Sequence, residues 1–167
     1  NYNVVALYFG GGTPTTLSAM DLEDVINKCF ECFNLDNLVE FTVEAGRPDT
    51  IDREKLETLK KCRVTRISIN PQTMNDSILN VIGRAHTVND IYESFKLARE
   101  CGFDNINMDL IAGLPYEDFV SFQKSFNEVY SMKPEQLQLG FLKVLKGAKI
   151  WEKAKEYGIT YTEKPPY

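Results

Sequence analysis

The stretch Asn3-Val4-Val5-Ala6-Leu7-Tyr8-Phe9-Gly10-Gly11-Gly12 decides the fold class of this chain. Before the glycines, the residues form a mainly apolar run of strand length. Such a run is typical of a strand that is buried on both faces, as in a parallel sheet. The sequence therefore predicts a buried parallel strand that ends in a tight turn.

A helix is expected directly after this turn. Ser18 and Asp21 form a capping-box pattern, which marks the start of a helix. Apolar residues then recur at helical spacing, at Leu22, Val25, Ile26, Cys29, Phe30 and Phe33. Strand and helix together make one βα unit.

The same alternation repeats along the rest of the chain. Further strands are predicted at 38–44, 65–70, 105–110 and 136–141, and further helices at 52–61, 75–82, 87–101, 117–130 and 148–157. Five βα units with parallel strands build either an open sheet or a barrel. Because 167 residues fall short of the about 250 of a complete eight-unit barrel, we expect one α/β domain over residues 1–167, a partial barrel.

Composition narrows the classes of partner. The chain is 43% hydrophobic and 26% charged, as in ordinary globular domains, and its net charge of -5 does not favour nucleic acid or anionic lipid. No apolar run reaches the roughly 18 residues that span a bilayer, and the first residues do not resemble a signal peptide. We expect a cytoplasmic protein with neither nucleic acid nor membrane as partner, and a piece excised from a longer chain.

The four cysteines do not suggest a disulfide framework, which belongs to short secreted scaffolds. Cys29 and Cys32 have the C-x-x-C spacing of redox and metal sites, but no second such pair accompanies them. We therefore expect reduced core cysteines and no metal site within the chain.

Polar groups stand where the predicted strands end, which is where barrels of this kind bind ligands. Residues 10–13 follow the first strand, Glu44 ends the second, residues 70–72 follow the third, and Asp109 ends the fourth. Three glycines in a row allow backbone N–H and C=O groups to approach a ligand closely.

Each of these groups also has a structural interpretation. The glycines are equally consistent with a tight turn alone, since neither a P-loop nor a dinucleotide-binding pattern follows them. Glu44 is placed either for proton transfer or ammonium binding or for an ion pair with Arg47 or Arg66. Asp109 either holds ligand hydroxyls or caps the following turn.

Two basic residues precede the helix predicted at 87–101. The guanidinium of Arg84 suits a two-pronged contact with a carboxylate. His86 comes just before the capping Thr87, so we expect a structural loop residue and assign no catalytic residue. The aromatic residues on or beside strands are expected to pack, namely Tyr8, Phe9, Phe41 and Phe141.

Five ordered motifs resemble those of the radical S-adenosylmethionine (SAM) enzymes. They are Tyr8-Phe9-Gly10-Gly11-Gly12-Thr13-Pro14-Thr15, Thr42-Val43-Glu44-Ala45-Gly46-Arg47-Pro48, Arg66-Ile67-Ser68-Ile69-Asn70-Pro71-Gln72-Thr73, Ile82-Gly83-Arg84-Ala85-His86 and Asp109-Leu110-Ile111-Ala112-Gly113-Leu114-Pro115. Within these enzymes the chain looks most like the oxygen-independent coproporphyrinogen III oxidase family, in its coproporphyrinogen dehydrogenase branch. Residues 138–147 and 165–167 look more like cobalamin-binding radical SAM proteins.

The resemblance implies a TIM-type radical SAM core, truncated before the strand and loop that bind the [4Fe-4S] cluster. In the family this cluster reduces SAM to a 5'-deoxyadenosyl radical, which attacks a propionate of the porphyrinogen. Carried over by motif, the residues that would bind SAM are Gly11, Gly12, Thr13, Glu44, Gln72, Arg84 and Asp109. The three cluster cysteines are expected upstream, so this fragment alone should be inactive. An electron donor such as flavodoxin or ferredoxin is implied as a partner.

Three other functions fit the same residues. The chain is also consistent with a haem-binding or haem-delivering protein of the same fold. It equally suits a cobalamin-type radical SAM enzyme with another substrate. The third is a plain barrel that binds a nucleotide or sugar phosphate at its glycine loop.

Overall fold

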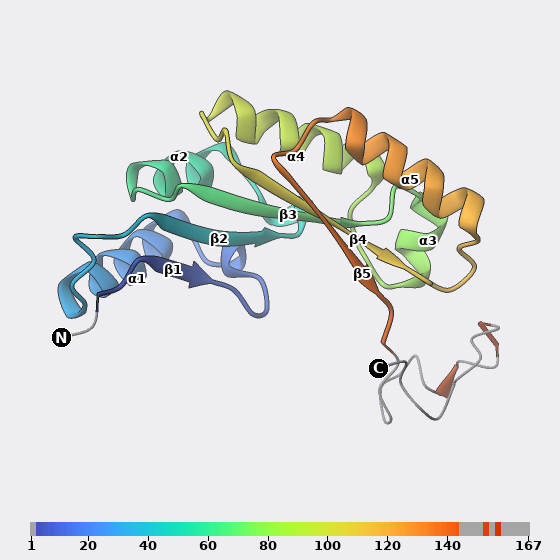
Figure 1. The fold of residues 1–167 in the computed structure, drawn as a ribbon, viewed down its shortest axis with the longest axis horizontal. Coiled ribbons are helices and arrows are strands. Elements are labelled where there is room, and N and C mark those ends of the chain that lie inside the picture. The colour runs from blue at the N-terminus through green and yellow to red at the C-terminus, as the bar shows by residue number, and fades with distance from the viewer. Residues whose placement is uncertain (1–2, 144–151, 154–155, 158–167) are drawn as a thin grey trace.

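The computed structural model describes residues 3–143, 152–153 and 156–157. Figure 1 shows a curled sheet with helices along its convex side. The elements in chain order are β1 (Ala6–Phe9), η1 (Pro14–Thr16), α1 (Ala19–Cys32), β2 (Glu40–Gly46), η2 (Pro48–Thr50), α2 (Arg53–Lys61), β3 (Arg66–Gln72), α3 (Asp76–Val81), α4 (Val88–Glu100), β4 (Ile106–Ala112), α5 (Phe119–Ser131) and β5 (Gln136–Phe141).

All neighbouring strands run parallel. Their order in the sheet is β1-β2-β3-β4-β5, the same as in the chain, so each strand lies beside its successor. The predicted alternation and the α/β partial barrel are confirmed. Because parallel strands share one direction, all five carboxyl ends lie along one edge of the sheet.

The helices begin where the sequence predicts them, because side chains cap their first turns. Ser18 accepts a hydrogen bond from the Asp21 backbone N–H, and Asp52 caps α2. Thr87 and Asp90 form a complete capping box at the start of α4.

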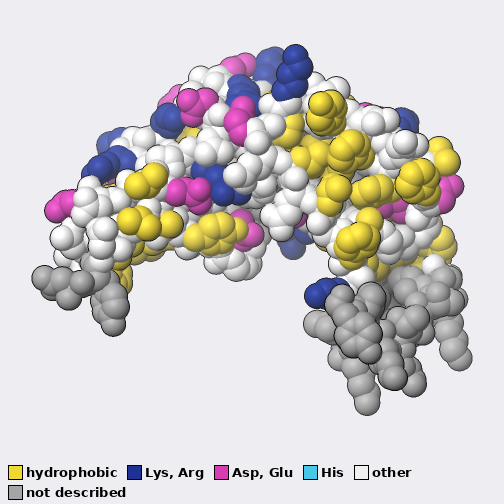
Figure 2. Space-filling model, viewed as in Figure 1, with side chains coloured by type: hydrophobic (Ala, Val, Ile, Leu, Met, Phe, Trp, Pro, Cys, Tyr) yellow, Lys and Arg dark blue, Asp and Glu magenta, His cyan; other side chains and the backbone are white. Residues whose placement is uncertain are grey.

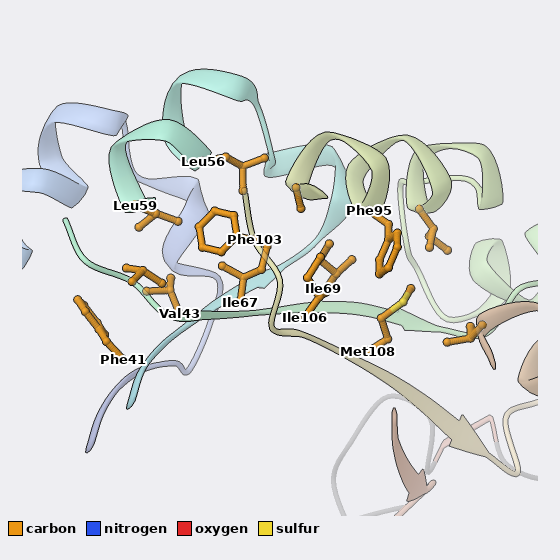
Figure 3. Packing of buried hydrophobic residues seen from close by; sticks show 14 of the residues in the cluster. Phe41, Val43, Leu56, Leu59, Ile67, Ile69, Phe95, Phe103, Ile106 and Met108 are labelled. Atoms are coloured by element: carbon orange, nitrogen blue, oxygen red, sulfur yellow. The ribbon is translucent and has the colours of Figure 1, made fainter. Parts of the chain in front are cut away.

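The apolar core lies between the convex face of the sheet and the helices (Figure 3). Alternate residues of each strand point into it, because side chains alternate between the two faces of a strand. Helix residues such as Leu56 and Phe95 complete it. The fully buried strand residues include Phe41, Val43, Ile67, Ile69, Ile106 and Met108.

The first strand is not buried on both faces, so that prediction was wrong. Leu7 and Phe9 pack against the core, whereas the side chain of Tyr8 on the opposite face is 57% exposed. Within the described residues β1 pairs only with β2, and helices cover only the convex face of the sheet. The inner face of β1 therefore lacks a second apolar layer.

Apolar side chains also gather on the outer surface, over the half of the molecule that holds α5 (Figure 2). Phe119 and Val120 at the start of α5 are exposed, as is Tyr130 near its end. Phe141 at the end of β5 is 81% exposed, so it does not pack as predicted. Strand β5 has only one neighbouring strand within the described residues.

The two cysteines of α1 are not core residues, contrary to the prediction. The buried stripe of α1 includes Leu22 and Ile26, while Cys29 is half-buried and Cys32 is exposed. The helix ends at Cys32, so Phe33 lies beyond it and is 59% exposed. The apolar spacing therefore extends past the part of the helix that contacts the sheet.

The helix predicted at 148–157 lies outside the described residues, apart from positions 152–153 and 156–157. Among the helices that the structure does describe, none has the length and apolar character needed to cross a bilayer.

Lys55 ties together the loops that follow β1 and β2. Its Nζ donates hydrogen bonds to the carbonyl oxygens of Thr15 (2.9 Å) and Thr50 (3.1 Å). The Thr15 hydroxyl, itself buried, lies 3.2 Å from the Ala45 carbonyl and 2.6 Å from the Thr50 hydroxyl. These contacts hold the glycine loop against the end of β2.

We predict that Val43→Ala lowers the free energy of unfolding by about 2 kcal/mol, because it removes buried methyl groups and leaves a cavity. Val39→Ala is the matched control, since Val39 is 78% exposed and Val43 fully buried. Urea unfolding of both variants measures the difference. Equal losses would contradict the placement of the core.

We predict that Lys55→Met lowers the free energy of unfolding by about 1–2 kcal/mol, because two partly buried carbonyls lose their donor. Lys124→Met is the control, because the Lys124 side chain is 78% exposed. Amide hydrogen exchange at Gly11, whose N–H donates to Glu44, should become faster in Lys55→Met only. Unchanged exchange there would show that Lys55 does not order the loop.

Candidate functional site

The glycine loop after β1 contacts a carboxylate of β2. The Gly11 backbone N–H donates to Glu44 Oε2 at 3.0 Å. Gly11 (φ 79°) and Gly12 (φ 66°) have left-handed backbone conformations, which favour glycine, and the space at their missing Cβ positions is open. Thr13 follows as the residue before η1. The loop therefore presents bare backbone beside an acidic group.

A second polar pair joins β3 to β4. Gln72 ends β3, and its Nε2 donates to Asp109 Oδ2 at 3.0 Å. The other carboxylate oxygen of Asp109, Oδ1, is buried and has no hydrogen-bond partner among the described residues. Gln72 has a φ of 69°, where the β3–β4 register shifts. The shift in register thus lies at Gln72, the residue whose side chain bonds to Asp109.

Burial controls the charge of Asp109. It raises the pKa of Asp109 to about 6, because a charged carboxylate loses solvation in the protein. The nearby Arg84 guanidinium and the Gln72 hydrogen bond act in the opposite direction, whereas Glu44 raises the pKa further. Asp109 is therefore a carboxylate that changes charge close to neutral pH.

Arg84 lies in the loop between α3 and α4 and is half-buried. Burial and the neighbouring Arg47 lower its pKa, while Asp109 and Asp49 raise it. Arg84 and Gln72 line a pocket of about 460 Å³ whose other walls are mostly apolar, from Ile82, Ile111, Leu114 and Pro115 among others. The guanidinium of Arg84 thus borders a mostly apolar pocket.

The structure places the seven predicted site residues in two groups along the carboxyl edge of the sheet. Gly11, Gly12 and Thr13 lie with Glu44 at the β1–β2 end. Gln72, Asp109 and Arg84 form the second group, over β3 and β4.

Arg66 does not form the ion pair that was considered for Glu44. Its Nη1 lies instead 3.4 Å from Oε1 of Glu40, four residues before Glu44 on the same face of β2. The register explains this choice, because Arg66 pairs with Thr42 and its side chain lies beside Glu40. Glu44 is left to the glycine loop.

His86 is a buried loop residue, as expected. Its Nδ1 lies 3.9 Å from Asp49 Oδ1, and within the part of the chain that the structure describes neither ring nitrogen has a hydrogen-bond partner. Burial and the nearby Arg84 lower the pKa of His86, so the ring is neutral at pH 7.

The cysteines lie away from this edge. Cys62 and Cys101 end α2 and α4, and Cys29 and Cys32 lie in the last turn of α1. The helices of βα units run antiparallel to the strands, so the C-terminal ends of the helices lie near the amino edge of the sheet. Within residues 3–143 and the four described positions beyond them, no three His, Cys, Asp or Glu side chains gather as a metal site.

Two residues with a role at the site were missed from the sequence. Lys55 bonds to the Thr15 carbonyl after the glycine loop, and Tyr8 lies against Gly10 beside Glu44, and both positions depend on tertiary structure. Lys55 lies among charged residues of an amphipathic helix, where nothing distinguishes it from its exposed neighbours. Tyr8 was expected to pack, although its position before the glycines on an alternating strand was a usable signal.

The arrangement suits a polar ligand with both donor and acceptor groups. The Glu44 carboxylate lies beside the exposed backbone of the glycine loop, and this combination suits the binding of an ammonium group. The free oxygen of Asp109 accepts donors such as hydroxyls, and Arg84 balances negative charge.

Sequence comparison places this geometry in a known family. The pattern of the Radical SAM superfamily matches residues 1–129. An oxygen-independent coproporphyrinogen-III oxidase-like protein, HemZ of Bacillus subtilis, is 41% identical over 96% of this chain and 32% of its own length. The heme chaperone HemW of B. subtilis is 42% identical over 77% of this chain and 34% of its own length. The chain thus spans about a third of these relatives.

Solved structures agree on the fold. The coproporphyrinogen III oxidase HemN of Escherichia coli superimposes with a TM-score of 0.77 at 29% identity, over 86% of this chain and 33% of that one. Elp3 of Methanocaldococcus infernus gives a TM-score of 0.80 at 21% identity, over 91% and 40%, and shows the fold alone. The five parallel strands are thus a fragment of a TIM-type barrel, and the chain belongs to the radical SAM superfamily.

Proposed function

We propose that this chain forms the SAM-binding part of a radical SAM oxidoreductase. We further propose that the whole protein oxidises a porphyrinogen with loss of propionate carboxyl groups. One observation carries the SAM assignment: two acidic side chains on separate strands reach the same edge, Glu44 on the glycine loop and Asp109 with a buried free oxygen. The names of the HemZ and HemN relatives support the substrate class.

The residues present fit SAM. Its amino acid part has an ammonium and a carboxylate, and its ribose has hydroxyls. Glu44 and the open backbone at Gly11 and Gly12 suit the ammonium, since an added Cβ at either glycine would point into empty space. Asp109 Oδ1 suits a hydroxyl, because it is a buried acceptor without a donor.

The described cysteines do not fit a [4Fe-4S] cluster at this edge. Such a cluster takes thiolate ligands, and these four thiols lie at the C-terminal ends of helices, away from the carboxyl edge of the sheet. We therefore assign its ligands to other residues of the full-length protein and derive no step through it from this chain.

The roles of this chain's residues follow from their contacts. SAM, when bound and reduced, supplies a radical that takes a hydrogen atom from the substrate. Glu44 and the glycine loop hold the ammonium, and Gln72 orients the Asp109 carboxylate by the 3.0 Å hydrogen bond. Arg84 lowers the cost of the Asp109 charge. The mostly apolar pocket beside Arg84 offers room for an uncharged part of a ligand.

Haem delivery is the second candidate. The observation that favours it is the 42% identity to HemW, equal to that of the oxidase-like relative within one percentage point. In this case the same barrel binds haem as cargo and does not oxidise porphyrinogen.

We predict that Asp109→Asn changes stability in a pH-dependent way. The pKa of Asp109 is about 6 in the folded protein against an ordinary 3.8, so its ionisation opposes folding. The free energy of unfolding then falls as the pH rises between the ordinary pKa of 3.8 and the folded pKa of about 6. Asp109→Asn should be more stable than wild type by about 1–3 kcal/mol at pH 7.5 and equal to it below about pH 3, where the carboxyl is protonated in both states.

The same variant should bind SAM about tenfold more weakly at pH 7.5, because the ligand loses a charged acceptor. Asp104→Asn is the control, since Asp104 is exposed in the loop before β4. Urea unfolding at both pH values and equilibrium dialysis with SAM measure the two effects. A variant that is less stable than wild type at pH 7.5 would show instead that the carboxylate stabilises the fold through Arg84.

The reaction is tested on the full-length protein, reconstituted anaerobically with iron and sulfide. We expect 5'-deoxyadenosine from SAM and a reductant, at a rate that rises when coproporphyrinogen III is added. Deoxyadenosine without that dependence would retain the enzyme class and reject the substrate. Haem binding with no porphyrinogen turnover would establish the carrier function.

A further inference from the structure

Tyr8 lies on the inner face of β1, next to Glu44. In the parallel register Tyr8 pairs with Thr42, and Glu44 is two residues further along β2 on the same face. Tyr8 and Glu44 are therefore diagonal neighbours, a spacing that aromatic and long side chains bridge. The residue as a whole is 57% exposed.

The ring of Tyr8 lies directly against Gly10. A Cβ added to Gly10 would come 2.2 Å from Tyr8 Cε1 and 3.1 Å from Glu44 Oε2. Tyr8, Gly10 and Glu44 thus form one contact cluster. Gly10 differs from Gly11 and Gly12, whose missing Cβ positions meet open space. Because Gly10 has no side chain, the Tyr8 ring has room to lie over its backbone.

The charges around Tyr8 favour a hydrogen bond from its phenol to Glu44. Burial raises the pKa of Tyr8, and the neighbouring Glu44 carboxylate raises it further. Asp109 acts in the same direction, whereas Arg66 lowers the pKa. The phenol therefore remains protonated and able to donate.

Glu44 is then held from two directions. The Gly11 N–H donates to its Oε2 at 3.0 Å from the loop, and the Tyr8 ring packs against Gly10 beside the same oxygen. A carboxylate on a strand has several rotamers, and these two neighbours favour one of them. The selected rotamer keeps the charge beside the glycine loop.

We propose that Tyr8 is a positioning residue that orients the Glu44 carboxylate toward the glycine loop, with Gly10 kept small to let the ring reach it. The inference rests on the proposed function, in which Glu44 receives the ammonium of SAM. Tyr8 acts through Glu44, so its removal should matter only while Glu44 is charged.

A double-mutant cycle in the reconstituted full-length protein tests this coupling. SAM affinity is measured by equilibrium dialysis for wild type, Tyr8→Phe, Glu44→Gln and the double variant. Tyr8→Phe should weaken binding about three- to tenfold in the wild-type background and have no effect beside Glu44→Gln. Tyr130→Phe is the matched control, because Tyr130 is 70% exposed on α5. The same fold-loss in both backgrounds would overturn the proposal.

A second measurement is independent of SAM. Titration of tyrosinate absorbance, taken as wild type minus Tyr8→Phe, isolates the Tyr8 phenol, and Glu44→Gln should lower its pKa. An unchanged pKa would overturn the Tyr8–Glu44 contact, even in a protein that binds SAM. Conversely, a wild-type protein that does not bind SAM, but in which Glu44→Gln lowers the Tyr8 pKa, would reject the proposed function and retain the contact.

Discussion

The parallel register of the five strands is the constraint on which the site depends. Side chains far apart in the sequence meet only because every carboxyl end reaches the same edge. Glu44 receives the N–H of Gly11 from 33 residues earlier, and Asp109 receives the amide of Gln72 from 37 residues earlier. A shift of one strand by one residue would turn these side chains to the opposite face.

One face of the sheet is apolar and the other is polar, and this contrast explains the raised pKa of Asp109. The convex face is apolar and packs against the helices, so the strands are rigidly held. The concave face carries polar groups such as Ser68, Asn107 and Asp109, of which Asn107 donates to Ser68 at 2.7 Å. Asp109 is buried among them without full solvation, and burial is the largest cause of its raised pKa.

Much of the local structure could be predicted from the sequence. Helix starts depend on capping side chains within a few residues, so Ser18 and Thr87 were identified correctly. The errors have one physical source, because burial depends on neighbours outside the segment. Tyr8 and Cys32 are apolar by pattern, but the concave face and the end of α1 leave them exposed. Strand alternation alone does not say what covers each face.

The sequence by itself determined the order of elements, the superfamily motifs and the identity of the candidate binding residues. These are local properties of glycines, caps and alternating strands. Tertiary structure alone decided the pairings: Arg66 with Glu40, Glu44 with Gly11, and Lys55 across two loops. The physical reason is that a side chain selects a partner by register and distance, and both are set only when the sheet assembles.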